Sequence, residues 1–172
     1  GLIERVHESP LSEFLNASEH VALGTDTSSR KKLWQYRDLH TDAISANGIP
    51  HKLDVTIPHG KLANFCNEIQ RIVNSYGADN ELFLFGHAGD GNIHVNILGP
   101  APEDLQVDEA VLDFVASLGG SISAEHGVGR AKARHLYLNR TPEEITIFHK
   151  IKNAFDPAGI LNPGAIIDPK VG

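Results

Sequence analysis

The stretch ELFLFGHAGDGNIHVNIL, residues 81–98, decides the fold. A continuous apolar segment, residues 82–85, and a segment of alternating apolar residues, 93–97, flank a short sequence rich in glycine and aspartate, residues 88–91. Such segments on either side of turn residues are typical of a β-hairpin. We therefore predict two antiparallel strands. In the second strand, Ile93, Val95 and Ile97 lie on one face, and His94 and Asn96 lie on the other.

The segments around this hairpin predict an α+β domain. Residues 51–57 alternate between apolar and polar side chains, residues 60–76 and 102–118 have helical spacing, and residues 121–124 form a short last strand. The order over residues 51–125 is βαββαβ, which predicts a ferredoxin-like antiparallel sheet with helices on one face. C-terminal helices and a tail are predicted for residues 130–172, and the 172 residues are expected to form a single domain.

Two further helices are predicted outside this core. The first is capped by Ser28 or Ser29 and runs to Asn47. Arg37 and Thr41 are four residues apart and share one of its faces. The second helix begins with a capping box at residues 141–144, and its predicted buried face consists of Ile147, Phe148, Ile151 and Phe155.

The composition excludes several classes of protein. A net charge of −7 without a basic block argues against binding to nucleic acid or to an anionic membrane. No apolar run is long enough for a membrane span or a signal peptide, so the cytoplasm is the expected compartment. Cys66 is the single cysteine, so no internal disulfide can form, and its helical neighbours predict a buried thiol.

The turn of the hairpin carries a candidate metal site. A loop of four residues would place His87 and His94 across the hairpin from each other, with Cβ atoms roughly 4.5–5.5 Å apart. Glu125 is the natural third ligand for zinc, although manganese or iron would also suit two imidazoles and a carboxylate. His126 follows Glu125 and is suited to accept a proton near neutral pH. The alternative is that these are ordinary surface histidines.

A second group of residues could bind an acidic substrate. Arg37 can hold a carboxylate through two hydrogen bonds, Lys52 adds a point charge, and Thr41 adds a hydroxyl donor. Each of them could instead be a solvated surface residue. The predicted topology also carries a conflict. A plain βαββαβ sheet places the hairpin tip and the end of the last strand at opposite ends, which separates Glu125 from His87.

Five motifs together resemble one family, the C-terminal cap domain of FAD-linked 2-hydroxy-acid dehydrogenases. This family includes D-lactate dehydrogenase, the glycolate oxidase flavin subunit and D-2-hydroxyglutarate dehydrogenase. The motifs are LWQYRD, KLDVTIP, GHAGDGNIH, AEHGVG and LNPG, at residues 33–38, 52–58, 86–94, 124–129 and 161–164.

The resemblance implies a role for each candidate. It makes His87, His94 and Glu125 ligands of a divalent metal, with zinc the first expectation. It makes His126 the base that accepts the hydroxyl proton while hydride passes from the same carbon to the flavin. Residues that hold the substrate would be Arg37, Thr41, Lys52 and Asn96, and Asn162 lies in a tail that returns toward the flavin in relatives.

The same resemblance implies a larger protein that oxidises a D-2-hydroxy acid, such as lactate, glycolate or 2-hydroxyglutarate, to the 2-oxo acid. FAD would be bound mainly by an N-terminal domain absent from these 172 residues, so we expect this chain alone to be inactive. The electron acceptor is not specified, and a homodimer or peripheral membrane attachment of the full-length protein is also open. The alternatives are a metal-dependent hydrolase, in which His126 activates a metal-bound water, and a non-catalytic metal-binding module.

Overall fold

The computed structural model describes residues 22–87 and 89–167, which belong to two compact units, residues 1–43 and 44–172. In the first unit, helix α3 (Thr27–Asp38) begins after Asp26, whose carboxylate accepts hydrogen bonds from the backbone N–H groups of Ser28 and Ser29. Asp26 is therefore the N-cap, and the predicted caps Ser28 and Ser29 lie inside the helix. The predicted long helix is also interrupted at Leu39, after which α4 (His40–Ala46) follows.

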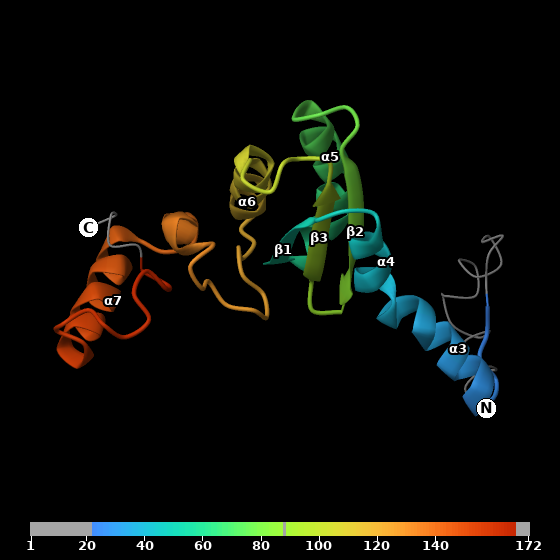
Figure 1. The fold of residues 1–172 in the computed structure, drawn as a ribbon, viewed down its shortest axis with the longest axis horizontal. Coiled ribbons are helices and arrows are strands. Elements are labelled where there is room, and N and C mark those ends of the chain that lie inside the picture. Colours follow the sequence, from blue (N-terminus) through green and yellow to red (C-terminus); the bar gives the residue numbers. More distant parts are fainter. Residues whose placement is uncertain (1–21, 88, 168–172) are drawn as a thin grey trace. The chain divides into compact units, whose positions relative to one another are not determined.

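The second unit contains the predicted hairpin. Strands β2 (Glu81–His87) and β3 (Asn92–Leu98) are antiparallel, and β1 (His51–Thr56) pairs antiparallel with β3 on its other side, as Figure 1 shows. The sheet order is β1-β3-β2. The helices predicted from sequence spacing are present as α5 (Leu62–Ser75), α6 (Gln106–Ser117) and α7 (Pro142–Phe155). The 3₁₀ helix η1 (His59–Lys61) overlaps the start of the predicted helix 60–76. A second 3₁₀ helix, η2 (Ala133–Leu138), lies in the C-terminal region for which helices were predicted without bounds.

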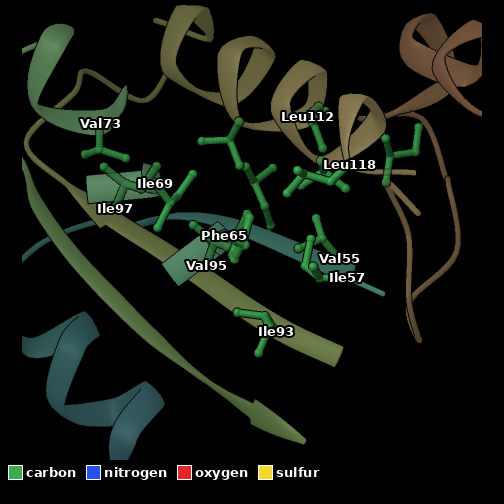
Figure 2. Close-up of a cluster of buried hydrophobic side chains, with 14 of the residues drawn as sticks. Val55, Ile57, Phe65, Ile69, Val73, Ile93, Val95, Ile97, Leu112 and Leu118 are labelled. Carbon is green, nitrogen blue, oxygen red and sulfur yellow. The ribbon is translucent and has the colours of Figure 1, made fainter. Parts of the chain in front are cut away.

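One face of the sheet is apolar and packs against α5 and α6 (Figure 2). The alternate residues of β1 and β3 that were predicted to share a face are buried there, and they meet Phe65, Ile69 and Val73 of α5. Helix α6 adds Val107, Val111, Leu112 and Val115. Because alternate strand residues point to opposite faces, Asp54, His94 and Asn96 face the other side of the sheet.

The fourth strand of a ferredoxin-like sheet is not confirmed. Among the described residues, Ser121 pairs with Thr56 in an isolated antiparallel bridge, and the N–H of Ala124 donates to the carbonyl of Asp54. Beyond that point the backbone N–H groups of Glu125 and His126 donate to the side chain of Asp54 instead of to the β1 backbone. The ladder therefore ends after a few residues, because a carboxylate takes the donors that would have continued it.

This short segment removes the conflict in the predicted topology. Thr56 pairs with Asn92 at the hairpin end of β3, so Ser121 begins beside the hairpin tip. The segment leaves the sheet at the level of Asp54, which is paired with His94. Glu125 is therefore held near the histidines and not at the far end of a full strand.

Two predictions about exposure are wrong. Helix α7 has the predicted capping box of Thr141 and Glu144 but buries no residue completely. Ile147 and Ile151 are about half exposed, and the side chain of Phe155 is 83% exposed. Cys66 is exposed as well. Hydrophobic spacing identified both helices correctly, but it does not show how much of each apolar stripe a neighbouring element covers.

No helix in residues 22–87 and 89–167 combines the length and the apolar character that a bilayer crossing requires. Localisation in the cytoplasm stays a prediction from the sequence.

We expect Gly91→Ala to destabilise the hairpin tip by about 1–3 kcal/mol. Gly91 has φ +76°, a backbone conformation that residues with a side chain rarely adopt. A Cβ at this position would lie 2.2 Å from the carbonyl oxygen of Ile57. That residue is held in place, because the N–H of Ile57 donates to the carbonyl of Gly91. Gly89→Ala is the matched control, because its Cβ would meet nothing within 4 Å of described structure and its φ is not in the left-handed region. Urea unfolding followed by circular dichroism compares them; equal stability of the two variants would contradict this account.

Candidate metal and proton-transfer site

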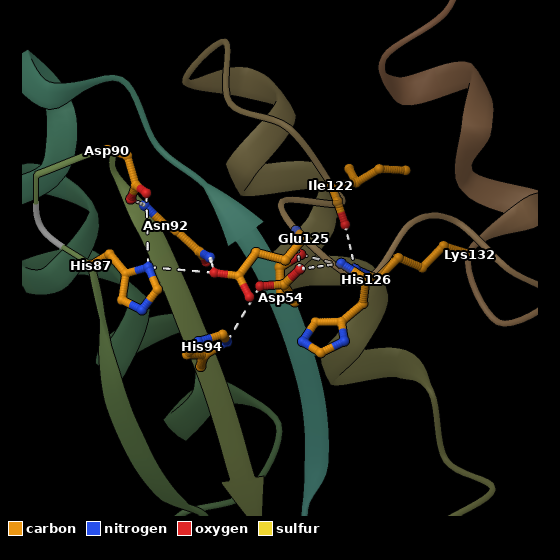
Figure 3. A network of polar contacts seen from close by, with 9 residues as sticks. All are labelled: Asp54, His87, Asp90, Asn92, His94, Ile122, Glu125, His126 and Lys132. Atoms are coloured by element: carbon orange, nitrogen blue, oxygen red, sulfur yellow. Dashed lines mark hydrogen bonds and ion pairs between the residues drawn. The ribbon is translucent and has the colours of Figure 1, made fainter. Parts of the chain in front are cut away.

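Three possible metal ligands converge on the polar side of the sheet, as Figure 3 shows. His87 ends β2, His94 lies in β3, and Glu125 follows the short segment beside β1. One ligand atom from each of the three lies within 4.8 Å of the other two, and Nδ1 of His87 is 3.4 Å from Oε1 of Glu125. Around a tetrahedral ion with bonds of 2.0–2.1 Å, ligand atoms are roughly 3.3 Å apart. Small side-chain movements would therefore let all three residues bind one ion.

The two histidines are diagonal neighbours, so the predicted direct pairing is wrong. Because the loop occupies residues 88–91, His87 pairs with Asn92 and His94 pairs with Phe85. Positions two residues apart on β3 share a face, which keeps both imidazoles on the polar side. Their ring centroids are 6.1 Å apart and the rings are nearly perpendicular. Side chains of diagonal neighbours can still reach one another, so the two histidines can still bind the same metal ion in this register.

Asn92 orients the carboxylate of this group. Its side chain is almost fully buried, and its Nδ2 donates a hydrogen bond to Oε1 of Glu125. The carbonyl oxygen of the same amide, Oδ1, is buried without a hydrogen-bond partner in the described structure. Two imidazoles with an oriented carboxylate fit zinc, and also manganese or iron(II).

Asp54 connects β1 to the segment that carries Glu125 and His126, a role that was not predicted from the sequence. It is 7% exposed, and its Oδ2 accepts hydrogen bonds from the N–H groups of Glu125 (2.7 Å) and His126 (3.1 Å). Its Oδ1 lies 3.3 Å from Nδ1 of His94. Burial alone raises the pKa of the Asp54 carboxyl, but the two amide donors and the charges of His126 and Lys132 hold it below its usual value. The available signal was the alternation of residues 51–57, which places Asp54 on the same face as Lys52.

Lys132 connects the segment before Glu125 to β1 through hydrogen bonds. Its buried ammonium group donates to the carbonyl oxygens of Asp54 (2.9 Å) and Ile122 (2.6 Å). Burial lowers the pKa of Lys132, and the negative charge of Asp54 opposes that effect. The lysine therefore bridges the two chain segments on which Asp54 and Glu125 lie.

The polar side of the second unit also carries three residues predicted for catalysis or substrate binding. The ring of His126 is exposed, and its centroid is 6.3 Å from that of His94. Lys52 pairs with Asn96, two positions along the strands from the pair formed by Asp54 and His94. Asn96 is buried, whereas Lys52 is exposed to solvent. Lys52 and Asn96 therefore lie two positions from His94 along the strands, and His126 lies beside the His94 ring.

Three other predicted residues lie elsewhere in the chain. Arg37 is on α3 and Thr41 on α4, both in the first unit. Asn162 is exposed in the tail after α7 and has φ +45°. Their participation in the site stays a prediction from the sequence.

Comparison with known proteins identifies similar chains. The family described as "FAD linked oxidases, C-terminal domain" matches residues 4–166. A D-2-hydroxyglutarate dehydrogenase of Stutzerimonas stutzeri is 41% identical over 144 residues, covering 79% of this chain and 31% of the relative. The mitochondrial D-2-hydroxyglutarate dehydrogenase of Danio rerio is 32% identical over 93% of this chain and 30% of its own length. An uncharacterized FAD-linked oxidoreductase of Mycobacterium tuberculosis is 37% identical over 80% of this chain and 30% of its own. The chain thus spans about a third of the length of these curated relatives.

Proposed function

The chain belongs to the family of C-terminal domains of FAD-linked oxidases, and from this premise we propose that it is the metal- and substrate-binding part of an FAD-dependent 2-hydroxy-acid dehydrogenase. The observation that carries the proposal is the convergence of His87, His94 and Glu125 beside His126. The names of two relatives, both D-2-hydroxyglutarate dehydrogenases, support a 2-hydroxy acid as substrate. The family and these names give no support to a hydrolase.

His126 is the proposed base. Its exposed imidazole would accept the proton of the substrate hydroxyl, and its backbone is held by Asp54, so the side chain starts from a fixed point. A divalent metal held by His87, His94 and Glu125 would polarise the hydroxyl oxygen and lower its pKa. The hydride on the same carbon would leave to the flavin, so that the C–H and O–H bonds of the alcohol become the C=O bond of a 2-oxo acid.

The substrate carboxylate requires local cations, because the chain has a net charge of −7. Lys52 is exposed beside the site and supplies one such charge. We propose that Arg37 and Thr41 also bind the substrate carboxylate. We further propose that Asn96, which is buried in β3, contacts the substrate from the polar face of the sheet. A bidentate arginine holds a carboxylate in one plane, which would fix the orientation of the reacting carbon.

We propose an N-terminal FAD-binding domain as the partner that supplies the hydride acceptor. The family is described as a C-terminal domain, and the relatives extend well beyond the matched region. Asn162 would contact the flavin from the tail. Within this proposal, the 172 residues alone bind metal and do not oxidise substrate.

The test is a calorimetric titration of the 172-residue chain with zinc and with manganese. We expect about one ion per chain for the unmodified sequence, and loss of that binding in His87→Ala and in His94→Ala, because each removes one of three protein ligands. His149→Ala is the matched control, since His149 lies on α7 outside the polar face. Unchanged stoichiometry in the first two variants would remove the metal site from the proposal.

A further inference from the structure

We propose that Asp54 is a positioning residue that holds His94 in the tautomer required for metal binding and at the same time fixes the backbone of Glu125 and His126. The inference rests on the proposed metal site. Strand β1 would then support the metal site through Asp54 as well as carry Lys52.

The two oxygens of Asp54 have separate partners. Oδ2 is occupied by the two backbone N–H groups of Glu125 and His126. Oδ1 is buried and makes no well-formed hydrogen bond within the described structure, but it faces Nδ1 of His94 at 3.3 Å. A buried unpaired carboxylate oxygen is costly, so a proton on Nδ1 pointing at Oδ1 is favoured over a lone pair there.

This choice of tautomer decides whether His94 can bind a metal. A neutral imidazole carries its proton on one nitrogen, so protonation of Nδ1 leaves the lone pair of Nε2 for the ion. Metal-binding histidines commonly donate a hydrogen bond from the N–H of their second ring nitrogen to a carboxylate in this way, which fixes the ring and makes the ligand more basic. Asp54 therefore links the orientation of His94 to the placement of Glu125 and His126 through one side chain.

A second cluster of possible ligands, formed by Asp54, His94 and His126, also has ligand atoms within 4.8 Å of one another. We assign Asp54 to the support of the metal site, because its Oδ2 accepts from two amides and its Oδ1 faces Nδ1 of His94. The two arrangements differ in their dependence on other residues. An ion bound by this second cluster would be lost in His126→Ala and retained in His87→Ala, and that result would overturn the role proposed for Asp54.

Asp54→Asn is the sharpest variant. An asparagine can still accept from the two backbone N–H groups through its oxygen, but it then presents an NH₂ group to Nδ1 of His94. That donor favours the opposite tautomer, with the proton on Nε2, and removes the ligand lone pair. We expect zinc affinity of the 172-residue chain, measured by competition with a chelator, to fall by about 10–100-fold.

Asp156→Asn is the matched control. Asp156 is also a buried carboxylate that accepts from two backbone N–H groups, those of Ile160 and Leu161, and it lies at the end of α7. The same chemical change there should leave zinc affinity unaltered. Equal affinity of Asp54→Asn and the unmodified chain would overturn the inference while leaving the metal site in place. Absence of zinc binding by the unmodified chain would instead overturn the metal site, and the role of Asp54 with it.

A second measurement does not depend on metal or on the folding of a variant. Nitrogen-15 NMR of the histidine rings in the metal-free chain at about pH 8, above the ordinary titration range of imidazole, reports which nitrogen carries the proton. We expect His94 to be protonated at Nδ1. Protonation at Nε2 would contradict the proposal even if Asp54→Asn failed to fold.

Discussion

Replacing His126 by alanine in the full-length, flavin-containing protein is expected to lower kcat for 2-hydroxy-acid oxidation by about 10²–10⁴-fold, the usual contribution of a positioned general base. The side chain of His126 makes no contact on which the backbone of the site depends, because it is the N–H of His126 that donates to Asp54. Alanine keeps that N–H. The variant therefore removes the proton acceptor and leaves Glu125 and the two metal ligands of the hairpin in place.

The necessary control is metal affinity, measured on the same preparation. It should match that of the unmodified protein, because His126 is not among the ligands His87, His94 and Glu125. The Michaelis constant should change far less than kcat, since a base acts on the transition state more than on substrate binding. A variant that oxidises substrate at the normal rate while it binds metal normally would show that another group takes the proton.

The sequence predicted those parts of the site that follow from strand alternation. The hairpin was predicted from two strand-like segments around turn residues, and the polar face of β3 and the position of Lys52 were predicted from period-two patterns. The structure confirms all three. The diagonal relation of His87 and His94 was not predicted, because it depends on the pairing of His87 with Asn92 across the loop. A shift of pairing changes which residues oppose each other, and turn composition alone does not fix it.

The missed residues are those whose role arises from contacts distant in sequence. Asp54 is separated by 71 residues from Glu125, whose backbone it binds, and Lys132 reaches Asp54 over 78 residues. Nothing in the local pattern of residues 51–57 distinguishes an aspartate that faces solvent from one that receives two amide donors. The predicted last strand, residues 121–124, forms only an isolated bridge at Ser121 and one backbone hydrogen bond at Ala124. The contacts of Asp54 with the N–H groups of Glu125 and His126 prevent the pairing with β1 from extending past that strand.

Phe65→Ala is expected to destabilise the second unit by about 3–5 kcal/mol, as is typical of removing a buried aromatic ring. Phe65 is fully buried on α5 and stacks on Phe114 of α6 with a centroid distance of 5.9 Å. The ring lies in the core that packs against β1 and β3 (Figure 2). The opposite face of these strands carries Asp54 and His94. Since small domains are stable by about 5–15 kcal/mol, this loss is a large fraction of the total.

Phe155→Ala makes the same substitution on α7, where the side chain is 83% exposed, and should change stability by less than about 0.5 kcal/mol. Guanidinium unfolding followed by circular dichroism compares the two variants. Zinc at saturating concentration should recover part of the stability lost in Phe65→Ala, because an ion that binds the folded state alone adds its binding free energy to folding. A similar loss in both variants would mean that α5 and α6 do not form the core that supports the polar face.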